Sequence, residues 1–148
     1  MKLQLSDVIS ICALAVSFLS IWLQGRSSQK QLLVANISEY TKRYQEIILN
    51  LPRVVLNSDF DINVVSEEEE TLILRYMLIY FNLCFEEYTL YFSLKLVDKK
   101  VWKIWESGIR SSLYRPAFRQ CWQIISQNSS YDGRFVAFMN SIASHHSP

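Results

Sequence analysis

The hydrophobic pattern of the chain begins with an apolar run from Val8 to Leu23, sixteen residues without a charge, a proline or a glycine. Counted from Leu3, the run is twenty-one residues long and has its few polar interruptions near its start. A bilayer core of roughly 30 Å needs about 20 mostly apolar helical residues. Trp22 lies at the end of the run, where an indole favours the headgroup region. The pattern predicts a transmembrane anchor in residues 1–25 and a separate domain in residues 26–148.

Two other interpretations of the apolar run are a cleaved signal peptide and a buried core helix. A signal peptide needs small residues at the −3 and −1 positions of its cleavage site. The sequence Trp22-Leu23-Gln24-Gly25-Arg26 offers no such pair, and Asp7 would lie in a basic region. A core helix usually has a polar face, whereas this run has only serines, alanines and one cysteine among its large residues. We therefore expect an anchor.

The charges that flank the run predict its orientation. Lysine and arginine are enriched on the cytoplasmic side of a membrane span. Only the terminal amine and Lys2 precede the run, and four basic residues follow it: Arg26, Lys30, Lys42 and Arg43. We therefore expect a single-pass protein of the inner (plasma) membrane with its C-terminal domain in the cytoplasm. The lone cysteines Cys84 and Cys121 agree with a reducing compartment.

Small residues recur along the run at spacings of 4-3-4-3, which keeps all of them on one face of a helix. They are Ser6, Ser10, Ala13, Ser17 and Ser20. Small residues mark contact faces between membrane helices, because they let two backbones approach closely. Chance enrichment in a weakly hydrophobic anchor is the alternative. We interpret the series as a membrane contact seam, facing a second copy of the chain or the helix of a protein partner.

After the anchor, the pattern changes to the periodicity of amphipathic helices. Apolar residues recur at helical spacing as far as Pro52, which ends this segment, and residues 53–66 have no clear period. Ser66 and Glu69 form a capping box that starts a long helix, which we expect to reach about Leu96. Its expected inward stripe is Leu72, Tyr76, Ile79, Tyr80, Leu83, Glu87, Leu90 and Leu94.

Further helix signals follow this long helix. Asp98 is a cap for a helix over residues 98–113, Pro116 suits the first position of the next helix, and residues 128–130 are a turn before the last. The predicted fold class is all-α, with one N-terminal transmembrane helix followed by a four- to five-helix soluble bundle. Three tryptophans are expected in its aromatic core rather than in a ligand-stacking site: Trp102, Trp105 and Trp122.

Composition supports this fold class and excludes some functions. Half of the 148 residues are hydrophobic, too many for a disordered tail, and three glycines with three prolines supply few turns for an all-β fold. The formal net charge is +1, and no basic stripe indicates a nucleic-acid partner. We therefore expect lipid and protein partners and no nucleic acid.

A search for catalytic patterns indicates no enzyme. The two histidines, His145 and His146, lie in a polar tail, and neither glutamate of the pair Glu86-Glu87 has a histidine three residues later, as a di-metal helix bundle requires. No phosphate-binding loop, nucleophile elbow or zinc motif occurs. The sequence therefore predicts no catalytic residues, no cofactor and no metal.

The pair Glu86-Glu87 is the most informative polar feature of the predicted core. Glu87 falls on the inward stripe, where an unpaired charge would cost several kcal/mol. One interpretation is an ion pair with Arg43, Arg110 or Arg119, or hydrogen bonds from tyrosine or indole groups. The other is a carboxyl group with a raised pKa that senses or binds something. We assign Glu86, Glu87 and Arg119 to a buried polar core.

Three segments carry a resemblance to a known group of proteins. They read N-x-x-x-E-E-Y-x-L-Y from Asn82, V-W-x-x-W-x-x-G-I from Val101, and P-A-F-R-x-x-W from Pro116. In these segments the chain resembles a loose family of uncharacterised bacterial single-pass membrane proteins with a cytoplasmic all-helical domain. The resemblance covers most of the chain. It implies a fold and a bacterial membrane location, and it implies no activity.

Two classes of function agree with these features. The first is a membrane-anchored helical interaction protein, an adaptor or accessory subunit that docks at a membrane complex. The alternative is an oligomerising membrane effector of the phage defence or exclusion type, triggered through its cytoplasmic domain. The weakly basic segment after the anchor suits either class.

Overall fold

The structure is a computed structural model that describes residues 20, 35 and 37–144. The chain divides into two compact units, Met1–Tyr40 and Thr41–Pro148. The described residues of the first unit, namely 20, 35 and 37–40, are helical. The predicted anchor and its contact seam, apart from Ser20, therefore lie outside the described residues. Within those residues, no helix combines the length and the apolar character that a membrane span requires.

The described part of the chain consists of helices and turns and contains no strand. Residues 37–50 form a helix. The elements after it are η1 (Arg53–Leu56), η2 (Ile62–Val64), α2 (Glu67–Tyr88), η3 (Thr89–Ser93), α3 (Lys99–Leu113), α4 (Pro116–Asn128) and α5 (Gly133–Ser144). The all-α helical bundle is confirmed.

The helix boundaries that depend on local capping agree with the sequence. The Ser66 hydroxyl accepts the Glu69 N–H at 3.3 Å, and four glutamates occupy the first turn of α2, where the helix dipole favours negative charge. Asp98 accepts the N–H groups of Lys100 and Val101 at 2.7 and 2.9 Å. Pro116 is in the first turn of α4, where the backbone N–H that proline lacks would have no partner within the helix.

The C-terminal end of α2 differs from the prediction. The α-helix stops at Tyr88 and continues as the wider π-helical turn η3 instead of running to Leu96. Lys95 then adopts a left-handed conformation with φ of 54°, and the Leu96 N–H donates to the Leu90 carbonyl at 2.9 Å. A residue in this conformation ends a helix, because the next N–H groups turn back to the last carbonyls.

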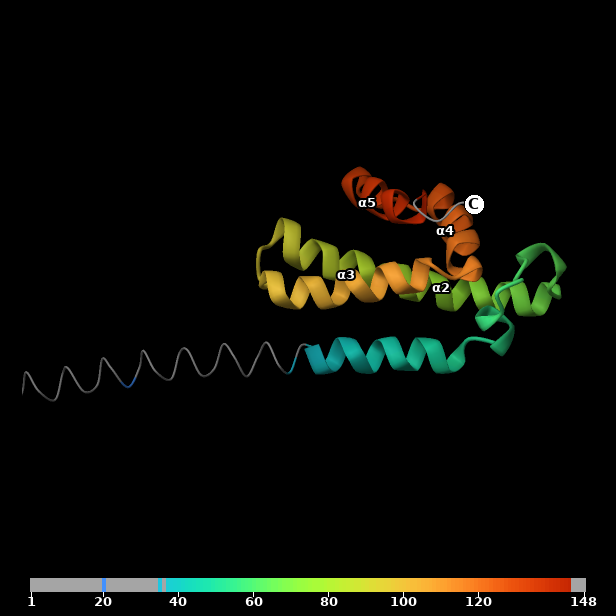
Figure 1. Ribbon diagram of the computed structural model, residues 1–148, viewed down its shortest axis with the longest axis horizontal. Coiled ribbons are helices and arrows are strands. Elements are labelled where there is room, and N and C mark those ends of the chain that lie inside the picture. The colour runs from blue at the N-terminus through green and yellow to red at the C-terminus, as the bar shows by residue number, and fades with distance from the viewer. Residues whose placement is uncertain (1–19, 21–34, 36, 145–148) are drawn as a thin grey trace, which may run out of the picture. The chain divides into compact units, whose positions relative to one another are not determined.

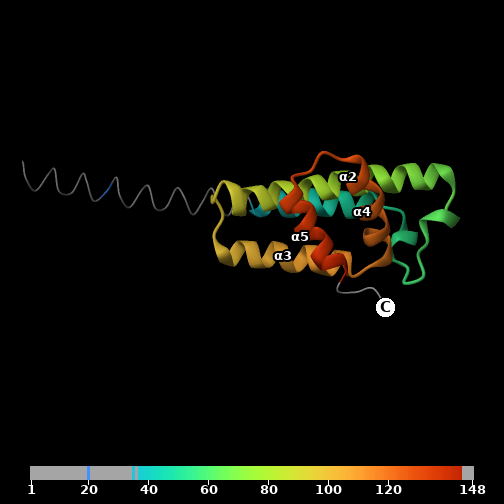
Figure 2. The ribbon, with the colours of Figure 1, turned by 90° about the horizontal axis from the view of Figure 1, so that it is seen from above.

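The unit of residues 41–148 is organised around α2. Helices α2 and α3 lie side by side and antiparallel (Figure 1), and α4 contacts both of them. Helix α5 contacts α3 and crosses the α2–α3 hairpin (Figure 2), with rings of Phe135 and Phe138 against Tyr88. Residues 41–50 lie along α2, where Tyr44 approaches Tyr80 with a ring-centroid distance of 6.1 Å.

The inward face of α2 is rotated by about one position from the predicted stripe. Leu72, Ile79 and Leu94 are 39%, 40% and 57% exposed, so the prediction is wrong for these residues. In the middle of α2, residues 72–85, Arg75 and Asn82 are the only charged or amide side chains. Periodicity alone therefore does not single out one face there, and the neighbouring helices decide it. The buried residues of α2 are Ile73, Met77, Tyr80, Phe81, Leu83, Cys84, Glu87 and Tyr88.

The three predicted core tryptophans do not share one environment. Trp122 is buried, its indole N–H donates to Asn140 Oδ1 at 2.8 Å, and its ring lies 5.0 Å from that of Phe81. Trp102 is also buried. Trp105 is only half-buried, although it lies between the buried residues Val101 and Ile109 on the same side of α3, so its assignment to the core is corrected.

The segment without clear period, residues 53–66, is held in place by one side chain of α4. Gln120 Nε2 donates to the Phe60 carbonyl at 2.8 Å, and Gln120 Oε1 accepts the Ile62 N–H at 2.9 Å. Both Phe60 and Ile62 are buried. The amide of Gln120 therefore replaces the backbone partners that a strand or helix would supply.

Replacing Gln120 with alanine is expected to lower the free energy of unfolding by about 1–3 kcal/mol, because two part-buried backbone groups lose their partner. Hydrogen exchange at residues 60–62 should become faster. The matched control is Gln123→Ala, an exposed glutamine of the same helix, which we expect to change the free energy by less than about 0.5 kcal/mol. Equal effects of the two variants in thermal melts would contradict this role of Gln120.

Candidate functional site: a buried polar row on α2

Three polar side chains follow one another along the inward face of α2. Tyr80, Cys84 and Glu87 are spaced by four and three residues, so they lie on one face of the helix, and all three are buried. Ser112 of α3 is also buried and interacts with the Tyr80 hydroxyl, which in turn interacts with the Cys84 thiol. We call Tyr80, Cys84, Glu87 and Ser112 the polar row.

An ion pair lies at the outer edge of the polar row. Arg43 binds Glu86 through two hydrogen bonds, Nη1 to Oε2 at 2.7 Å and Nη2 to Oε1 at 3.2 Å. The two side chains are 37% and 45% exposed, so Glu86 is not the buried residue that the sequence predicted. Arg43, one of the partners considered for Glu87, instead binds the neighbouring glutamate.

The other two candidate arginines bind elsewhere. Arg119 is half-buried and donates to the carbonyls of Leu113 and Tyr114 at the C-terminal end of α3. Arg110 donates to Glu106 on its own helix, with Nη2 and Oε1 2.7 Å apart. Arg119 therefore does not join Glu86 and Glu87 in one cluster. Arg119 binds at the end of α3 because the last carbonyls of a helix have no N–H partner within the helix and accept hydrogen bonds from other donors.

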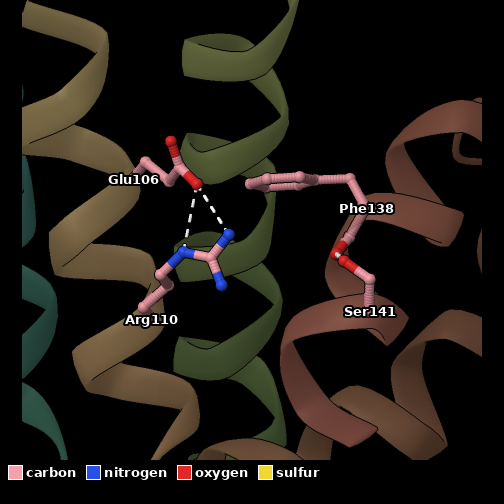
Figure 3. A network of polar contacts seen from close by, with 4 residues as sticks. All are labelled: Glu106, Arg110, Phe138 and Ser141. Atoms are coloured by element: carbon pink, nitrogen blue, oxygen red, sulfur yellow. Dashed lines mark hydrogen bonds and ion pairs between the residues drawn. The ribbon is translucent and has the colours of Figure 1, made fainter. Parts of the chain in front are cut away.

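Figure 3 shows the surroundings of the Glu106–Arg110 pair. The ring of Phe138 projects from α5 toward the pair on α3, and the Ser141 hydroxyl donates to the Phe138 carbonyl at 2.7 Å. Arg110 and Glu106 are four residues apart on an exposed helix face, and such pairs contribute only about 0.3–0.5 kcal/mol. The pair is exposed and lies within α3, so Arg110 is not a partner of the polar row.

Glu87 is the one buried carboxyl group of the described residues. Burial, and to a smaller extent the negative charge of Glu86, raises the pKa of Glu87 to about 8, while Arg43 opposes the shift. No donor in the described part of the chain makes a hydrogen bond to its carboxyl group that would stabilise the charged form. At neutral pH this side chain is therefore mainly uncharged. The structure favours the second of the two interpretations, a carboxyl group with a raised pKa.

The thiol and hydroxyl groups of the row are also in their protonated forms. Burial, followed by the charge of Glu87, raises the pKa of Cys84 well above its usual value, and burial does the same for the pKa of Tyr80. Burial raises the pKa of Cys121 on α4 to about 12. A thiol reacts as a nucleophile in its thiolate form. The polar row is thus a set of protonated groups, suited to hydrogen bonding and to the release of a proton from Glu87.

The structure brings together residues that the sequence had placed in separate roles. Glu87 and Tyr80 were part of an apolar stripe, Cys84 was a lone thiol, and Ser112 carried no prediction. The spacing of Tyr80, Cys84 and Glu87 was visible in the sequence as a signal. Only the packing of α3 on α2 adds Ser112. Among the described residues, no group of three or more histidine, cysteine, aspartate or glutamate side chains could hold a metal ion.

Comparison with known proteins adds no identity to this geometry. No family model, no curated protein and no solved structure matches the chain.

Proposed function

We propose that this chain is a membrane-anchored helical interaction protein, an adaptor or accessory subunit whose domain docks at a membrane complex. Residues 1–25 would hold the protein in the inner membrane, and residues 26–148 would lie in the cytoplasm. The observation that carries the proposal is the division of the chain: the apolar run Val8 to Leu23 belongs to one unit, and residues 41–148 pack as another.

The outer face of α2 supports an interaction role for the helical unit. Leu72, Leu78 and Ile79 are between 39% and 42% exposed, although they belong to the central helix of the unit. Large exposed apolar side chains are available for contact with another protein. The buried polar groups, in contrast, are protonated, and Tyr80 interacts with Ser112 and Cys84 inside the unit.

The test of this proposal uses the predicted seam in the anchor. Ala13→Leu with Ser17→Leu places large side chains where close backbone approach is expected, and interhelical contacts of this kind contribute about 1–2 kcal/mol. Crosslinking and co-purification in mild detergent should therefore decrease roughly tenfold, while the protein stays in the membrane fraction. The readout is mass spectrometry of the proteins captured by a C-terminal tag.

The matched control changes the opposite face of the run, with Leu14→Ala and Ile21→Ala. We expect this pair to leave the captured partners unchanged. Equal losses with both pairs would contradict the seam. Recovery of the chain in the soluble fraction would contradict the anchor itself. Toxicity on overexpression that disappears when the run is replaced, without a captured partner, would instead indicate the oligomerising effector.

A further inference from the structure

The end of the α2–α3 hairpin exposes large apolar side chains. We call residues 89–104 the tip; they comprise η3, the turn after it and the first turns of α3. Four apolar residues of the tip are exposed, and the fractions are 47%, 57%, 69% and 68% for Phe92, Leu94, Leu96 and Ile104. The tip is therefore a more exposed apolar surface than the outer face of α2.

The same segment concentrates positive charge. Lys95, Lys99, Lys100 and Lys103 are all exposed, and Asp98 is the only acidic residue among residues 89–104. The Asp98 carboxylate is engaged by the backbone N–H groups of Lys100 and Val101. No carboxylate of the described residues forms an ion pair with any of the four lysines. The tip thus has a formal charge of +3 within a chain of +1, so the remainder of the chain is net negative.

Ring packing and backbone turns fix the shape of the tip. Tyr91 stacks on Trp102 with ring centroids 5.0 Å apart and an interplanar angle of 4°, and Phe92 meets the same indole edge-on at 5.1 Å. The turn back at Lys95 and Leu96 closes the end of the helix. The exposed leucines and lysines therefore lie on a segment whose backbone is held in place by packed aromatic rings.

The tip lies at the same end of the unit as its first residues, from residue 41 on. Arg43, close to the start of the unit, binds Glu86, which lies three residues before η3. The helix that contains Arg43 then runs away from the tip toward η1 (Figure 1). Residues 24–40 connect the apolar run to this unit. These seventeen residues span about 60 Å at most, even when fully extended.

We propose that the tip docks on the anionic lipid surface of the membrane that holds the anchor. The lysines would contact lipid phosphates, and the exposed leucines and Ile104 would enter the boundary between headgroups and acyl chains. Basic residues beside exposed apolar residues are the combination that binds an anionic bilayer surface. A second copy of the tip fits less well, because its charge has the same sign. This inference rests on the proposed function, since the anchor brings the tip within reach of lipid.

The experiment compares the full-length protein in nanodiscs of phosphatidylcholine alone and of phosphatidylcholine with phosphatidylserine. Hydrogen exchange of residues 89–104 should be slower with phosphatidylserine, and the difference should shrink at high salt, because salt screens surface charge. Lys99→Glu with Lys103→Glu should lower this protection at least about tenfold, since each lysine near such a surface contributes roughly a factor of five. The matched control, Arg53→Glu with Arg115→Glu, makes the same charge change on exposed residues away from the tip and should leave the protection unchanged.

The other possible outcomes distinguish a failure of the docking surface from a failure of the proposed function. A chain that does not enter nanodiscs contradicts the anchor and with it the docking surface. A chain that enters them, with equal exchange of the tip in both lipid mixtures, contradicts the docking surface alone. Protection that depends on the number of chains in each nanodisc, and not on lipid charge, would overturn the lipid assignment in favour of contact between copies.

Discussion

Replacing Trp122 with alanine is expected to lower the free energy of unfolding by about 3–5 kcal/mol, the range for removal of a fully buried large aromatic side chain. The indole lies between the rings of Phe81, Tyr131 and Phe135, with centroid distances of 5.0, 5.9 and 5.8 Å. The substitution leaves a cavity among these rings and removes the hydrogen-bond partner of Asn140. Both losses act on the contact between α4, α2 and α5.

The measurement is a thermal melt of the full-length protein in mild detergent, followed by circular dichroism at the helical band. A loss of this size should lower the melting temperature by at least about 10 °C. The matched control is Trp105→Ala, the same change at a half-buried tryptophan of α3, for which we expect less than half of the effect. Similar decreases for both variants would mean that the two indoles have the same burial, contrary to the structure.

Replacing Glu87 with glutamine is expected to stabilise the protein at alkaline pH and to have little effect at pH 5. The variant keeps the size of the side chain and removes its titration. The pKa of Glu87 is raised to about 8, from 4.5 for an unperturbed glutamate. Between these values the folded protein binds more protons than the unfolded chain, so the free energy of unfolding decreases as the pH rises.

The size of this pH effect follows from the shift. Below about pH 4.5 the carboxyl group is protonated in both states, and above about pH 8 it is ionised in both. Each unit of pKa difference corresponds to about 1.4 kcal/mol, so the wild-type protein should lose roughly 3–5 kcal/mol relative to Glu87→Gln over this window. The measurement is the difference in melting temperature between the two proteins from pH 4.5 to pH 9. A difference that stays constant with pH would contradict the buried, raised-pKa carboxyl group.

Glu86→Gln provides the matched control for the neighbouring carboxylate. In the wild-type protein, the charge of Glu86 raises the pKa of Glu87, and Glu86 forms an ion pair with Arg43. Without that charge, the pKa of Glu87 should fall, because the neighbouring negative charge that raises it is removed. We therefore expect Glu86→Gln to keep a pH dependence and to move it to lower pH. The direct stability cost of this exposed pair should be within about 1 kcal/mol.

The helix boundaries were predictable because they depend on neighbours in sequence. The caps at Ser66 and Asp98 satisfy backbone N–H groups within three residues. The proline at the start of α4 lacks an N–H that would have no partner in the helix. The end of α2 was not predictable in the same way. Its π-helical turn and the left-handed Lys95 accompany the packing of Tyr91 and Phe92 on Trp102, a residue of the following helix.

The candidate site was only partly predictable for a related reason. The inward position of Glu87 followed from helical spacing, and it holds even though the stripe around it is rotated. The partners of the three candidate arginines could not be predicted from helical spacing, because the long side chain of an arginine can bind any of several nearby carboxylates or carbonyls. Arg43 binds Glu86, Arg110 binds Glu106, and Arg119 binds the end of α3.

The sequence by itself determined the all-α fold class and the buried position of Glu87, and it predicts an N-terminal anchor. These features depend on composition, on local capping and on the period of a helix, all of which are properties of neighbouring residues. Only the tertiary structure decided which face of α2 is buried, which carboxylate is paired, and that apolar and basic residues gather at the tip. These depend on contacts between helices, because the mostly apolar middle of α2, residues 72–85, acquires a buried and an exposed face only when other helices pack against it.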